Sequence, residues 1–93
     1  MPWFVSDLPC SFSAWLKDEL HSKCSASYKD DEVIVDSMAQ SVEFILHNKE
    51  MTLEEKKQKM GVAITVIGVP KSFCDEIVNK VDQLKISTAT VGV

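Results

Sequence analysis

The strongest constraint on the fold is an amphipathic stretch of ten residues near the start of the chain, residues 11–20. Its large apolar side chains recur at intervals of three and four positions, as one face of a helix requires: Phe12, Trp15, Leu16 and Leu20. Such a helix is stable in water only when this face packs against other elements. We therefore expect Trp15 to be buried against the remaining helices, close to Gly61.

The limits of this first helix are predicted from its flanking residues. Pro9 cannot continue a helix backward, and the hydroxyl of Ser11 or Ser13 could accept a hydrogen bond from the first turn. We expect one of these serines to be the N-cap and the helix to end near Ser22. The preceding residues 1–10 are expected to form an arm.

Two further helices are predicted with defined starts. Acidic residues 30–32 precede a broad apolar stripe over residues 33–46, which favours a central helix with its positive dipole end beside the acids. Residues 52–55, Thr-Leu-Glu-Glu, have the form of a capping box and should open the next helix. Gly68 and Pro70 should close that helix.

A last helix is predicted after Ser72, and its apolar period stops at Lys85. With 93 residues and a hydrophobic fraction of 45%, the chain is suited to one domain with a substantial core. The prediction is an all-α fold, a compact bundle of four or five short helices in a single domain, 1–93. The bundle should occupy 11–85, followed by a tail at 86–93.

Residue types that carry chemistry are sparse, and we assign no catalytic, cofactor-binding or metal-binding residue. Cys10, Cys24 and Cys74 are odd in number and form no Cys-x-x-Cys pair, so neither disulfides nor a zinc site is expected. His21 and Cys24 stand one helical turn apart, but no second pair completes a tetrahedral set. His47 fits a stabilising role at a helix carboxyl end. We expect a protein that is not an enzyme and uses no small-molecule substrate.

The longest apolar run, residues 61–70, is about half of the roughly 20 residues that a membrane-spanning helix needs. The first residues lack the basic and apolar segments of a secretory signal. We therefore expect an intracellular protein with no membrane anchor.

Charge is unevenly distributed along the chain. The net charge is -4, and residues 1–48 contain three lysines against eight acids, while residues 49–93 contain seven lysines against six acids. Arginine, which binds phosphate with two parallel hydrogen bonds and stacks on bases, is absent. This composition favours a protein partner over a nucleic acid.

Two sets of residues are candidates for binding. The aromatic and aliphatic residues of the arm could anchor a partner or fold back over the core: Trp3, Phe4, Val5 and Leu8. A basic set could contact RNA, although Glu50, Glu54 and Glu55 interleave with it and offset its field: Lys49, Lys56, Lys57 and Lys59. A solvated helix face is the alternative for the lysines.

The order of residues resembles the PWI domains of RNA-processing proteins. Ser13-Ala14-Trp15-Leu16 resembles the Pro-Trp-Ile tripeptide that opens their first helix, 30–35 resembles the acidic start of the second, and 67–81 is similar to their glycine turn and last helix. The resemblance covers about residues 11–84. The spacing of the aromatic residues and of Glu54-Glu55-Lys56 is closest to the PWI-like domain at the front of the coiled-coil domain-containing protein 43 family. Ala14 and Leu16 depart from the tripeptide, and the basic flanking segment is missing.

The resemblance implies a helical module of a nuclear assembly for RNA processing, including mRNA splicing, without a cofactor. We expect a non-enzymatic protein-interaction module that acts as an adaptor, with an unidentified protein partner. The alternative is a weak RNA-binding domain of the PWI type.

Overall fold

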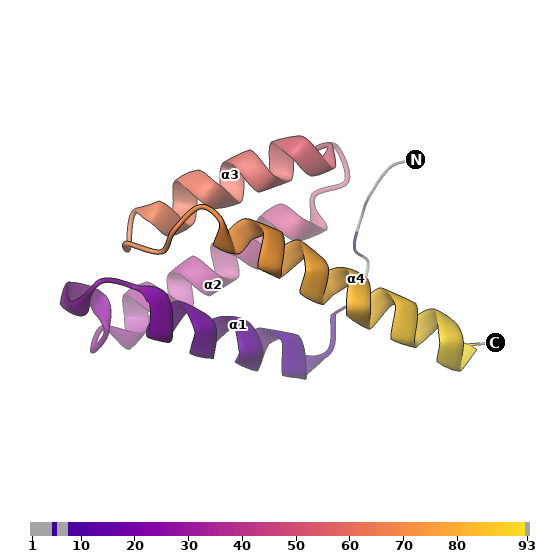
Figure 1. Ribbon diagram of the computed structural model, residues 1–93, viewed down its shortest axis with the longest axis horizontal. Helices are drawn as coiled ribbons and strands as arrows, with labels where there is room; N and C mark the ends of the chain where they lie inside the picture. Colours follow the sequence, from indigo (N-terminus) through magenta and orange to yellow (C-terminus); the bar gives the residue numbers. More distant parts are fainter. Residues whose placement is uncertain (1–4, 6–7, 93) are drawn as a thin grey trace.

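The computed structural model describes residues 5 and 8–92, with side chains up to Leu84, and is all-helical over that part of the chain. It has four α-helices and one short 3-10 helix: α1 Cys10–Lys23, η1 Ala26–Tyr28, α2 Glu32–His47, α3 Leu53–Thr65 and α4 Phe73–Gly92 (Figure 1). The predicted all-α bundle of four helices is confirmed.

Helix α2 lies centrally, with α1 against one side and α3 against the other, and α4 contacts both α1 and α3 (Figure 1). Helix α2 is central because its apolar stripe is broad. Val35, Ala39, Val42 and Leu46 are buried, and Ile34, Met38 and Ile45 are half-buried against the same core. The period predicted for α2 therefore corresponds to the face that the other helices cover.

Each remaining helix contributes one apolar face to that core: Phe12, Leu16 and Leu20 from α1, Met60 and Ile64 from α3, and Phe73, Ile77 and Val81 from α4. All eight side chains are at most 1% exposed. Burial of one such side chain is worth about 1.5–3 kcal/mol, so the core binds the helices together.

Trp15 lies at the edge of this core, which corrects the expectation that it would be buried beside Gly61. The indole is half-buried, with the rings of Phe12 and Phe73 each 5.8 Å away between centroids. The Lys80 ammonium lies 5.5 Å from the indole centroid. Because Phe12, Leu16 and Leu20 already form the innermost face of α1, Trp15 is turned sideways toward α4.

The helix starts differ in how they are capped. Asp31 accepts a hydrogen bond from the Ile34 amide at 3.1 Å and so caps α2. Thr52 accepts one from the Glu55 amide at 3.2 Å, which confirms the cap predicted there. The predicted serine cap of α1 is wrong. The N-cap is Pro9, whose carbonyl accepts from the Phe12 amide at 2.9 Å, while the Ser13 hydroxyl donates to Glu43 of α2.

Helix α4 is longer than its apolar period predicts, because it continues past Lys85 to Gly92. Residues 86–91 contain no proline or glycine, and each residue added to an existing helix gains a backbone hydrogen bond without a new nucleation cost. The segment expected as a tail is therefore helical to residue 92, and Figure 1 shows these turns extending beyond the other helices.

The connection from α3 to α4 depends on Gly68, whose φ of 88° lies in the left-handed region. The Gly68 amide donates to the Thr65 carbonyl at 3.0 Å, and the Val69 amide donates to the Ile64 carbonyl at 3.1 Å, which is the hydrogen-bond pattern of a Schellman motif. The connection after α1 touches this turn, since the Ser25 amide donates to the Ile67 carbonyl at 2.9 Å.

Gly68→Ala should lower the free energy of unfolding by about 2–4 kcal/mol, from left-handed backbone strain and overpacking together. A Cβ there would lie 2.9 Å from both the Cβ and the amide nitrogen of Ser25. Gly61→Ala is the matched control, because its Cβ would meet Lys71 and Cys74 at ordinary distances of 3.5–3.9 Å. It should raise stability by about 0.5–1 kcal/mol. Urea unfolding of both variants checks this, and equal stability would contradict it.

Candidate functional site

The described part of the arm is held on the bundle. Val5 is buried in the core with 3% of its surface exposed, and Leu8 is half-buried against it. The Val5 carbonyl lies 3.0 Å from Nδ1 of His47, which must donate because a carbonyl oxygen can only accept. Of the candidate partner-binding residues, Trp3 and Phe4 lie outside the described residues. Val5 contacts the core of its own chain and is unavailable to a partner.

The four candidate RNA-binding lysines do not form one surface. Lys56 is fully buried, which removes it from the set. Lys57 is half-buried and pairs with Asp75 of α4 at 3.3 Å. Lys49 and Lys59 are exposed. A phosphate group could therefore reach only part of the predicted set.

The burial of Lys56 follows from its place on α3. It lies on the same helical face as Leu53 and the buried Met60, three positions before and four positions after it, and this spacing is the signal that could have identified it. Its ammonium donates to the Leu46 carbonyl at 2.7 Å, in the last turn of α2. A cation is favourable at this negative end of the helix dipole, so Lys56 ties α3 to α2.

Lys56→Ala should lower the free energy of unfolding by about 2–5 kcal/mol, because it removes a charge-assisted hydrogen bond and leaves a cavity. Lys59→Ala on the same helix is the control. Its side chain is exposed, so the change should stay within about 0.5 kcal/mol. Chemical denaturation measures both, and an equal effect of the two substitutions would contradict the assignment.

The surroundings of the buried Cys74 disfavour a reactive thiolate. All three cysteines are free thiols; Cys10 is exposed, while Cys24 and Cys74 are buried. Burial raises the pKa of the Cys74 thiol, and the neighbouring Asp75 charge adds to the effect, against smaller opposing contributions from a backbone hydrogen bond and from Lys57. A raised pKa lowers the fraction of reactive thiolate. Among the described residues, no group of three or more His, Cys, Asp or Glu side chains could hold a metal ion.

This shift predicts a pH dependence of stability. The folded protein holds the Cys74 proton more tightly than the unfolded chain does, so the contribution is complete below the ordinary pKa of 9.0 and is lost as pH rises above it. Over roughly pH 8–10, the interval around that pKa, the free energy of unfolding of the wild type should fall more steeply with pH than that of Cys74→Ala. Urea unfolding at each pH checks the slopes, and parallel slopes would contradict the prediction.

A concentration of carboxylates lies where α1 ends and α2 begins. Two adjoining hollows share Glu32, one lined also by Asp30 and Asp31 and the other by Asp18 and Asp36. We call these five residues the acidic end. The two lysines beside them are engaged: Lys17 pairs with Asp36 at 3.1 Å, and Lys29 donates to the Ser22 carbonyl at 3.0 Å.

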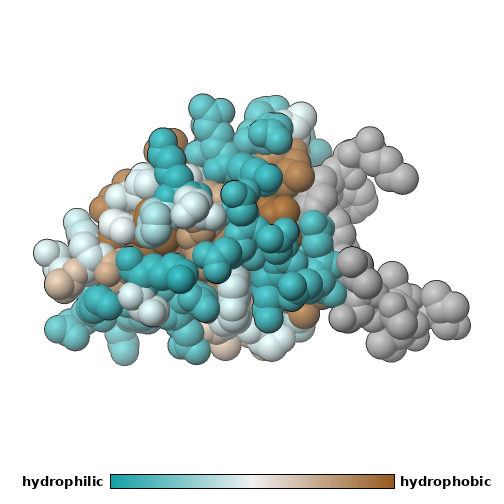
Figure 2. Space-filling model, viewed as in Figure 1, coloured by the Kyte–Doolittle hydropathy of each residue, from teal (hydrophilic) through white to brown (hydrophobic). Residues whose placement is uncertain are grey.

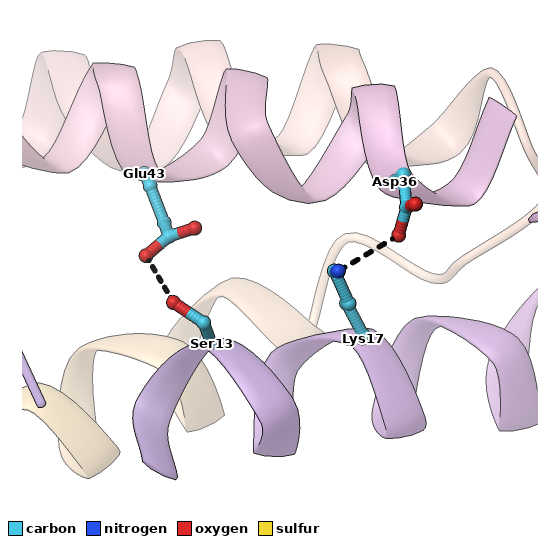
Figure 3. Close-up of polar contacts among 4 residues, drawn as sticks. All are labelled: Ser13, Lys17, Asp36 and Glu43. Atoms are coloured by element: carbon cyan, nitrogen blue, oxygen red, sulfur yellow. Dashed lines mark hydrogen bonds and ion pairs between the residues drawn. The ribbon is translucent and has the colours of Figure 1, made fainter. Parts of the chain in front are cut away.

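The positions of α1 and α2 in this region are fixed by two polar contacts shown in Figure 3. Ser13 and Lys17, one turn apart on α1, contact Glu43 and Asp36 of α2 at 2.8 and 3.1 Å. The ion pair is exposed and contributes only about 0.2–1 kcal/mol. Its effect is geometric, because it holds Asp36 at the edge of α2 that faces α1.

On the face shown in Figure 2, hydrophilic residues cover much of the described surface, with apolar residues visible between them. Asp18, Asp30 and Glu32 are exposed, so the carboxylates of the acidic end can reach a partner. Within the described part of the chain, no helix has the length and apolar character that crossing a bilayer requires.

Comparisons of the chain with protein-family models, with curated proteins and with solved structures gave no match. The resemblance to PWI domains therefore stays a prediction that depends on the residues of the sequence.

Proposed function

We propose that this protein is a non-enzymatic interaction module that binds a basic segment of another protein. The observation that carries the proposal is the acidic end, where five carboxylates line two hollows together with two lysines and one histidine, Lys17, Lys29 and His21. Complementary charge steers a basic partner to such a surface and disfavours an acidic one.

The cellular setting comes from the resemblance to PWI domains. It supports an adaptor role in a nuclear assembly for RNA processing, in which proteins with basic segments are natural partners for an acidic surface. The proposal needs no cofactor, because charge and shape alone provide the recognition.

Weak RNA binding is the second candidate. It would depend on Lys49 and Lys59, which are exposed, since Lys56 is buried and Lys57 is paired with Asp75. Repulsion from the acidic end would oppose it, because phosphate contacts provide most of the affinity of such proteins.

The acidic end should determine the affinity for a basic peptide. As the probe we choose an unstructured fluorescent peptide of alternating lysine and glycine. Its affinity should fall roughly tenfold in the triple variant Asp18→Asn, Asp30→Asn, Glu32→Gln, because each neutralised surface charge costs about 0.5 kcal/mol. Fluorescence anisotropy at low and moderate salt measures this, and salt should weaken binding to the wild type more than to the variant.

The matched control removes the same charge elsewhere: Glu50→Gln, Glu54→Gln, Glu76→Gln, three exposed acids outside the acidic end. This triple variant should bind the peptide nearly as well as the wild type does. Equal losses in both triple variants, or tighter binding of a short RNA than of the peptide, would contradict the proposed function.

A further inference from the structure

Helix α2 has a second ordered face on the side opposite its core stripe. We call it the outward face of α2, and its residues are Val33, Ser37, Gln40, Ser41 and Phe44. All five are exposed, and Val33 and Phe44 are 75% and 73% exposed, the two highest values among the large apolar side chains that the structure describes.

The outward face has the spacing of a helix-packing seam. Four of its residues are spaced by four, three and four positions: Val33, Ser37, Gln40 and Phe44. This alternation of intervals keeps one stripe of a helix in contact with a partner helix. Since the buried stripe already holds α2 in the bundle, this second stripe is unoccupied by the described helices.

The outward face carries no charge, unlike the wet face of an ordinary surface helix. The exposed face of α3 is the comparison within this protein: it also displays a large apolar side chain, Val62, but together with Glu54, Glu55 and Lys59. An uncharged stripe loses little when a partner displaces its water, because no ion must be desolvated.

Phe44 and its neighbours form a shallow hollow on this face, lined by Ser37, Gln40, Ser41, Phe44 and the half-buried Ile45. The serines are small, so a partner backbone can approach α2 closely beside the phenyl ring. An exposed aromatic ring next to such an approach is the usual form of an interface anchor.

The charges that border the outward face define its occupant. Val33 lines the same hollow as Asp30, Asp31 and Glu32, so the face is continuous with the acidic end. Asp36 and Glu43, one turn from these seam positions, edge the side toward α1. A partner helix therefore meets neutral residues along its seam and the acidic end at one end of it. Along one edge it meets Asp36, already paired with Lys17, and Glu43, which accepts from Ser13.

We propose that the outward face of α2 docks an amphipathic helix of another protein, with small and apolar residues on its seam and lysine or arginine beside them. This inference rests on the proposed function and specifies its partner. A second copy of this chain is a poorer occupant, because an antiparallel pair of α2 helices sets the Asp36 and Glu43 edges against each other. Docking of one helix on one 16-residue helix gives a small, reversible interface.

The probes for the test are three synthetic 18-residue peptides. The first has alanine and leucine on one helical face and lysine beside it; the second has the same composition in scrambled order, without an apolar face; the third is the first peptide with glutamate in place of lysine. The first should bind at least tenfold more tightly than the second, and the third should not bind. Amide chemical-shift changes should cluster on α2.

Phe44→Glu should weaken binding of the first peptide at least tenfold, although the added negative charge would by itself attract a basic peptide. Val62→Glu is the control, because it adds the same charge at a valine of α3 that is 59% exposed. It should leave the affinity unchanged. Phe44→Ala should give a smaller loss in the same direction, and circular dichroism of each variant confirms that the bundle is folded.

Three other outcomes would contradict the docking of a partner helix, and they differ in what they imply for the proposed function. Equal binding of the first and second peptides, with both weakened in the acidic-end triple variant, overturns the docking face and leaves the proposed function standing. Absence of binding by both basic peptides overturns both. Sedimentation of the protein alone as a dimer that Phe44→Glu dissociates overturns the partner helix in favour of a second copy.

Discussion

The turn at Gly68 is the constraint on which the arrangement of the helices depends. Its left-handed backbone reverses the chain between α3 and α4, and the absence of a side chain lets Ser25 approach closely enough to donate to the Ile67 carbonyl. The connection after α1 and the connection before α4 are thereby joined. Helix α1 ends and α4 begins beside this point, and where the two helices contact each other Trp15 lies between Phe12 and Phe73.

The opposite end of the bundle is joined by a different interaction, the hydrogen bond from Lys56 to the Leu46 carbonyl. Placing an ammonium group in a core is costly unless a strong acceptor compensates it, and the carbonyls at the end of a helix are such acceptors. The Val5 carbonyl and His47 lie in this same region, so the arm and α3 both dock where α2 ends. The consequence for function is that this end is occupied by the chain itself, while the start of α2 remains accessible.

The sequence predicts the helices well because their signals are local. The stripe of α2, the Thr52 cap and the glycine at the end of α3 each depend on residues within one or two turns, and each lies where it was expected. The N-cap of α1 was predicted wrongly for a reason that local patterns do not contain. Pro9 is the N-cap, and the Ser13 hydroxyl instead donates a hydrogen bond to Glu43 of α2, thirty positions away in the sequence.

The candidate site was harder to predict, since it depends on which side of each helix the bundle covers. Lys56 is next to other lysines in the sequence, which suggested a basic patch. Its position on the same helical face as the buried Met60 is the signal that it lies in the core. Trp15 looks like the innermost residue of α1 for the same reason. The outward face of α2 was not predicted. The sequence of α2 contains many apolar residues, and only tertiary contacts show that Val33 and Phe44 lie opposite the core stripe.

The contacts of the lysines support the proposed preference for a protein partner over RNA. Six of the nine lysines with described side chains contact groups of their own chain: Lys17, Lys23, Lys29, Lys56, Lys57 and Lys80. Three of these lysines pair with acids, Lys17, Lys23 and Lys57, and Lys56 is buried against a carbonyl. Of the five acids of the acidic end, Asp36 is paired with Lys17 and Asp31 caps α2, while Asp18, Asp30 and Glu32 are exposed. Under the proposed function, the acidic end repels a polyanion that approaches α2, whereas a basic helix is attracted toward the outward face of α2, whose seam is uncharged.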